Sequence, residues 1–67
     1  MTDHEPDPVV VTVELTDPQA LALAQFVKRL SFAEARGCAV DEAEAYRIID
    51  GVGRLQRALA DVGYAPR

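Results

Sequence analysis

Residues 8–16 read PVVVTVELT, and this stretch decides the fold expected for the chain. Residues 9–13 are all β-branched, and such side chains favour an extended backbone over a helix. No later stretch reads as a second strand, because everything after Thr16 follows a helical pattern. A lone strand leaves its backbone N–H and C=O groups unpaired. The sequence therefore predicts a strand over 9–15 that pairs with its copy, as a two-stranded antiparallel ribbon across the axis of a homodimer.

The alternation of side chains along this strand predicts the dimer interface. One face would cover the helices and hold the two copies together, and it consists of Val9, Val11, Val13 and Leu15. The opposite face carries Val10, Thr12 and Glu14. A carboxylate at Val11 or Val13 is accordingly expected to unfold the protein or disrupt the dimer, because it would bury an unpaired charge.

The strand is followed by a helix predicted over 17–36. Thr16 and Gln19 have the spacing of a capping box, and Pro18 suits the first turn of a helix. Apolar residues then recur at helical spacing up to Phe32 and Ala33, and Gly37 is suited to end the helix.

A second helix is predicted over 42–62. Asp41 is a typical N-cap residue, and Gly63 can close the other end. Between them runs a stripe that consists of Ala45, Ile48, Ile49, Val52, Leu55, Leu59 and Val62. The expected protomer is thus β-α-α, mostly helical, with an acidic flexible tail over 1–8 and a single dimerisation domain over 9–67.

Gly51 and Gly53 are irregular within this second helix. Each glycine costs about 1 kcal/mol relative to alanine in a helix interior. Two explanations for the presence of Gly51 and Gly53 stay open: a close crossing with another helix, or a kink in this helix. A phosphate loop is not, because the strand-to-helix context, the third glycine and the lysine of such loops are missing.

Composition favours a small oligomer. The chain has 67 residues, of which 49% are hydrophobic, but many of these are alanine and none is tryptophan. A monomer of this size has a marginal core, which oligomerisation can enlarge. Cys38 is the only cysteine, so we expect a small, at least half-buried thiol in a reducing compartment. No apolar run is long enough to span a membrane, and these features together predict a cytoplasmic protein.

The charge distribution and the chemistry-bearing residues argue against catalysis. The formal net charge is −4, and three of the eleven acids lie within residues 1–8, which leaves eight acids against seven bases elsewhere. The single histidine, His4, lies in the tail, so no Ser–His or Cys–His pair falls within the predicted domain. Metal binding would need further His or Cys residues. We therefore expect no enzymatic activity, no metal and no cofactor.

The predicted topology resembles that of ribbon-helix-helix repressors, which insert a paired strand into the major groove of DNA. The resemblance implies a DNA-binding regulator or antitoxin as an alternative function. The outward strand face carries no Arg, Lys, Asn or Gln, however, and the second helix opens with Asp41, Glu42 and Glu44. Phosphate binding relies on Lys and Arg, so nucleic acid is an unlikely partner.

A protein-binding module is the remaining class. Aromatic residues and arginine are frequent anchors of interfaces. The candidate partner contacts are Phe32, Arg36, Tyr46, Arg47, Arg54 and Tyr64. Two structural alternatives stay open: Phe32 and Tyr46 can close the ends of the core, and the arginines can form a salt-bridged solvent face with neighbouring acids.

Three segments, ELTDPQALALAQFVKR (14–29), AVDEAEAY (39–46) and ALADVGYAPR (58–67), resemble a family of short, uncharacterised proteins encoded by phages and prophages of proteobacteria. The resemblance implies a gene carried on a mobile element. Small acidic phage proteins that form compact dimers are often inhibitors of host systems, including anti-CRISPR proteins. The function implied is therefore binding to a host protein or complex in the host cytoplasm, alongside self-association as a homodimer.

Overall fold

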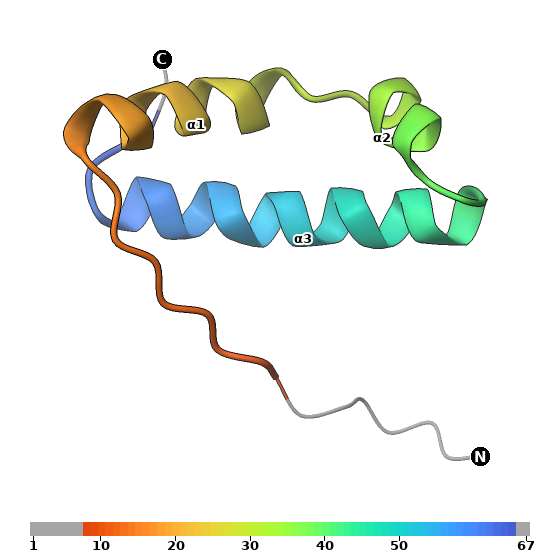
Figure 1. The fold of residues 1–67 in the computed structure, drawn as a ribbon, viewed down its shortest axis with the longest axis horizontal. Coiled ribbons are helices and arrows are strands. Elements are labelled where there is room, and N and C mark those ends of the chain that lie inside the picture. Colours follow the sequence, from red (N-terminus) through yellow and green to blue (C-terminus); the bar gives the residue numbers. More distant parts are fainter. Residues whose placement is uncertain (1–7, 66–67) are drawn as a thin grey trace.

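The computed structural model describes residues 8–65, and in this range it contains three helices that follow an irregular N-terminal segment. The helices are α1 (Asp17–Arg29), α2 (Phe32–Cys38) and α3 (Glu42–Asp61). Figure 1 shows that α1 and α2 follow one another along the same side of α3, which runs back beneath both of them. The fold is therefore two layers of helix, with α3 as the element that α1 and α2 share.

The predicted strand over 9–15 and its two-stranded ribbon are wrong. Residues 8–16 contain no strand, and the part of the chain that the structure describes is otherwise helices and turns. β-Branched residues favour an extended backbone, but a strand also needs a second strand to receive its hydrogen bonds. Nothing between residues 16 and 65 supplies one. We call residues 8–15 the valine arm, which passes across α3 and continues away from the helices (Figure 1).

Helix α1 begins where the sequence predicts. The Gln19 backbone N–H donates to the Thr16 hydroxyl over 3.2 Å, and the Thr16 N–H donates to the Gln19 side-chain oxygen over 3.0 Å. These reciprocal bonds satisfy two backbone donors that a helix N-terminus leaves open. The predicted capping box is thus confirmed, with Pro18 in the first turn.

The helix predicted over 17–36 is interrupted at Leu30–Ser31 and becomes α1 and α2. Leu30 leaves the helical conformation with ψ 127°, and Ser31 has ψ 165°. Ser31 then caps α2, because the Glu34 N–H donates to its hydroxyl while the Glu34 carboxylate accepts from the Ser31 N–H. The Ser31–Glu34 spacing is a second capping box, which the continuous apolar pattern concealed. The break places α2 against the first half of α3.

We expect Ser31→Ala to lower the free energy of unfolding by about 1 kcal/mol, because the cap of α2 is lost. Ser31→Asp retains a side-chain acceptor and should stay close to the original value. Urea unfolding followed by circular dichroism compares the three proteins. Equal loss in both variants would contradict a capping role for this residue.

Helix α3 matches the predicted helix over 42–62 to within one residue at its end. The Glu44 N–H donates to the Asp41 carboxylate over 2.8 Å, which confirms the predicted cap. At the other end Gly63 has φ 103°, a left-handed conformation that glycine adopts without strain. The chain then turns back, so that the Tyr64 N–H donates to the Leu59 carbonyl. This turn brings Tyr64 to the start of α1, where its hydroxyl donates to the Asp17 carboxylate.

The core between α1 and α3 is small and rich in alanine. Its buried residues are Ala20, Ala24, Val27 and Leu59, with Leu23, Val52 and Tyr64 packed against them. In α2 and the first half of α3 the buried residues are Ala35 and Ala45. Short side chains let the helices lie close together, but they remove little apolar surface from water. Much of the larger apolar surface therefore stays exposed.

Candidate functional site: an apolar groove and an aromatic corner

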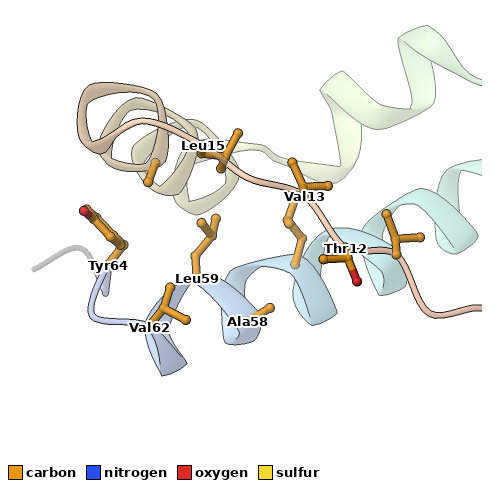
Figure 2. A pocket seen from close by; sticks show the side chains of 10 residues that line it. Thr12, Val13, Leu15, Ala58, Leu59, Val62 and Tyr64 are labelled. Atoms are coloured by element: carbon orange, nitrogen blue, oxygen red, sulfur yellow. The ribbon is translucent and has the colours of Figure 1, made fainter.

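The valine arm and the second half of α3 enclose a groove of about 500 Å³. Figure 2 shows side chains from the arm, from α3 and from the C-terminal turn around the same hollow. The lining is almost entirely apolar and consists of Val11, Thr12, Val13, Leu15, Ala20, Leu55, Ala58, Leu59, Val62 and Tyr64. We refer to this hollow as the groove.

Several groove residues have large exposed side chains. Val11 is 74% exposed, Val13 63% and Val62 69%. Contiguous apolar surface of this kind on a small domain marks an interaction site. The groove is therefore the first of two candidate binding surfaces.

The sequence places the dimer interface on alternate residues of the arm, and this alternation depends on a strand that residues 8–16 do not form. Val11, Val13 and Leu15 do line the groove, but Thr12 from the opposite face lines it too. Val9 is 85% exposed and Val10 is 86% exposed. At the start of the valine arm, therefore, neither of the two faces predicted for the strand covers a helix. A segment outside a β-sheet need not alternate its side chains between two faces, so consecutive residues of the arm can line the same groove.

The second candidate surface lies at the opposite end of α3, and we call it the aromatic corner. The rings of Phe32 on α2 and Tyr46 on α3 are 4.8 Å apart between centroids and inclined by 40°. Tyr46 is 59% exposed, and Val40 in the connection between the two helices is 82% exposed. Phe32 is half-buried, so it supports the exposed ring of Tyr46. The ring pair thus closes one end of the fold and also presents an aromatic face to solvent.

Arg36 belongs to the same corner. It lies one helical turn after Phe32, and its Nη1 donates to the Ala39 carbonyl over 3.3 Å. That bond directs the guanidinium toward the connection between α2 and α3 and leaves most of its five N–H donors available. Val40 itself is held by its backbone N–H, which donates to the Glu44 carboxylate over 2.9 Å.

The six predicted contact residues do not form one patch. Phe32 and Tyr46 pack together at the aromatic corner, and Arg36 lies one helical turn after Phe32. Tyr64 lines the groove at the other end of the molecule. Arg54 borders a separate shallow hollow with Asp50 and Arg57, and Arg47 is exposed on α3.

The predicted salt-bridged face of α3 is not observed. Within residues 8–65, Arg47, Arg54 and Arg57 make no ion pair with the acids one turn away. Isolated exposed pairs of this kind contribute little to stability, and the three arginines are exposed.

Sequence reasoning missed an exposed stripe on α3. Gly51, Leu55, Ala58 and Val62 recur at intervals of four, three and four residues, and all four are exposed. We call these residues the outer stripe. The sequence places Leu55 and Val62 in one apolar stripe with Leu59, but they stay exposed because the apolar face of α3 is wider than α1 and α2 cover. The heptad-like spacing is the signal that could have identified this stripe.

The part of the chain that the structure describes offers few other reactive or metal-ligating groups. Cys38 is a free, exposed thiol, which corrects the expectation of a half-buried one. Residues 8–65 hold no cluster of three or more metal-ligating side chains, and none of their helices is long and apolar enough to cross a membrane. His4 lies outside the described residues.

A protein-family model matches residues 1–67, the whole chain, and the chain belongs to that family, a family of unknown function (DUF7706). No curated protein and no solved structure matches the chain.

Proposed function

We propose that this protein is a non-enzymatic protein-binding module whose aromatic corner contacts the partner. The observation that carries the proposal is the exposed ring of Tyr46 packed against Phe32, with the exposed Val40 and the Arg36–Ala39 hydrogen bond at the same end of the fold. Tyrosine and arginine are enriched among residues that dominate binding energy, especially where a rigid neighbour supports them. Phe32 supplies that support for Tyr46.

The chemistry of the corner defines the partner surface. Tyr46 and Val40 favour an apolar depression, while the free donors of Arg36 favour a carboxylate at its rim. The partner is therefore a folded protein with an apolar pocket beside an acidic residue.

Within this class we propose an inhibitor of a host system, such as an anti-CRISPR protein encoded by a phage. The similarity of segments 14–29, 39–46 and 58–67 to phage and prophage proteins supports this choice. A small protein can inhibit a larger complex by covering one of its surfaces, and the aromatic corner offers such a contact.

No observation favours the DNA-binding alternative. The ribbon that would enter the major groove is absent from residues 8–65. The first turn of α3 carries Glu42 and Glu44 beside the Asp41 cap, and these carboxylates repel phosphate.

Tyr46→Ala tests the assignment of the corner. We expect partner affinity to fall by a factor of at least about 30, the loss typical of a central aromatic anchor. Phe26→Ala is the matched control, because Phe26 is 57% exposed, close to the 59% of Tyr46, but lies on α1. The partner is first isolated from host lysate and identified, and the dissociation constants are then measured with the purified partner.

Phage plaquing tests the inhibitor assignment. Expression of the protein in a strain whose CRISPR–Cas system targets a phage should restore plaques, and Tyr46→Ala should not. Equal effects of Tyr46→Ala and Phe26→Ala on affinity would overturn the corner as the contact. Unchanged plaquing across CRISPR–Cas types would overturn the anti-CRISPR assignment.

A further inference from the structure

The groove and the outer stripe form one continuous apolar surface on a protein whose own core is small. Leu55, Ala58 and Val62 belong to both. The buried cluster between α1 and α3 contains only Ala20, Ala24, Val27 and Leu59. Domains below about 70–80 residues commonly complete such a core by association.

Gly51 gives the outer stripe a shape suited to another helix. A side-chain carbon added at Gly51 would meet nothing within 4 Å, so the protomer itself does not need the glycine. Glycine is nevertheless unfavourable in the middle of a helix. A neighbouring backbone that approaches the helix closely explains the residue, and in the described chain no segment does so.

The charges that flank the stripe are arranged for a second copy of the same helix. Arg47 precedes Leu55 by eight residues and Asp61 follows it by six. When two copies of α3 run antiparallel and cross near Leu55, residues at similar distances on either side of the crossing face one another. Arg47 then meets the partner's Asp61, and symmetry repeats the pair.

The same crossing brings the small residues together. Gly51 lies four residues before Leu55 and Ala58 three residues after it, so Gly51 meets the partner's Ala58 and the helices can approach closely. Arg54 meets its own copy near the axis, and this like-charge contact opposes the association. The pairing of opposite charges and the pairing of small residues are two independent features, and both are compatible with the same antiparallel register.

We propose that the groove and outer stripe form a homodimer interface in which two α3 helices cross antiparallel near Leu55. The valine arm of each protomer borders this interface, because Val11 and Val13 line the groove beside Leu55 and Val62. The interface uses helix packing and involves no pairing of strands. It leaves the aromatic corner of each protomer free, and the proposal does not depend on the function assigned to that corner.

Gly51→Arg against Gly53→Arg is the first test. Gly53 is the matched control, since it lies in the same helix, has nothing within 4 Å of an added side-chain carbon, and borders the separate hollow of Asp50 and Arg57. Sedimentation at micromolar concentration should give twice the 7.3 kDa chain mass for the unchanged protein and for Gly53→Arg. Gly51→Arg should weaken association at least about tenfold, because the side chain fills the close approach. Circular dichroism should show that both variants remain helical.

Charge exchange tests the register. Arg47→Asp places two pairs of acids in contact, and Asp61→Arg places two pairs of bases in contact, so each variant alone should dimerise about tenfold more weakly. A mixture of the two variants should form a heterodimer with an affinity near that of the unchanged protein, because both pairs become complementary again.

Each outcome of these experiments decides the proposal. A folded monomer at micromolar concentration, or equal weakening by Gly51→Arg and Gly53→Arg, would overturn the interface. Failure of the mixture to associate better than either variant would overturn the antiparallel register. Loss of partner binding with retained dimerisation, as expected for Tyr46→Ala, would separate this interface from the proposed function.

Discussion

Ala24→Asp is expected to unfold the protein. Ala24 is 1% exposed and lies among Ala20, Val27 and Leu59 in the core between α1 and α3. An uncompensated carboxylate at such a position costs several kcal/mol. A domain of this size has a free energy of unfolding of about 3–10 kcal/mol, so the substitution removes most or all of it. The measurement is the loss of the helical circular dichroism signal at ambient temperature.

Ala22→Asp provides the matched control. Ala22 is in the same helix two residues earlier, and it is exposed. The same carboxylate there should change stability by no more than about 0.5 kcal/mol, as is usual for surface positions. If both variants stay folded, or if both unfold, the packing of α1 against α3 differs from the one described.

The exposure of the valine arm changes what we expect of a charged substitution there. The sequence predicts that a carboxylate at Val11 unfolds the protein or disrupts the dimer, because it assigns the residue to a buried strand face. Val11 is in fact 74% exposed, so Val11→Asp should leave the helices intact. β-Branched residues specify an extended backbone, and the sequence alone does not show whether a second strand exists to bury them.

Helix ends are the part of the fold that the sequence predicts well. The caps at Thr16 and Asp41 depend on side chains within three residues of the backbone groups they satisfy, and the stop at Gly63 depends on the left-handed backbone conformation that glycine adopts locally. The break at Ser31 follows the same local rule. It was missed because Leu30, Phe32 and Ala33 continue the helical spacing of the apolar residues across it.

The candidate site is less predictable because it depends on which residues the core leaves uncovered. Tyr46 and Phe32 were named from residue type, and the structure places them together. Arg54 and Tyr64 were named for the same reason and lie elsewhere. Residue type indicates what can bind, whereas the position of α2 on α3 decides which side chains share a surface.

Leu59→Ala is expected to lower the free energy of unfolding by about 2–5 kcal/mol, the range for truncating a buried leucine. Leu59 is 5% exposed and is the largest side chain in the buried cluster. The neighbouring Ala20 and Ala24 cannot extend to fill the space it leaves, so the cavity persists. Urea unfolding followed by circular dichroism measures the loss.

Leu21→Ala makes the same chemical change at a position that is 51% exposed, and it should cost less than about 1 kcal/mol. Because Leu59 also lines the groove, the comparison needs two protein concentrations: dimer dissociation adds a concentration-dependent part to the measured stability. The two variants differ in their free energy of unfolding, and the part of this difference that persists on dilution is the contribution of the core within one chain. If dilution abolishes that difference, Leu59 acts mainly through the contact between copies, and α1 is held on α3 chiefly by association.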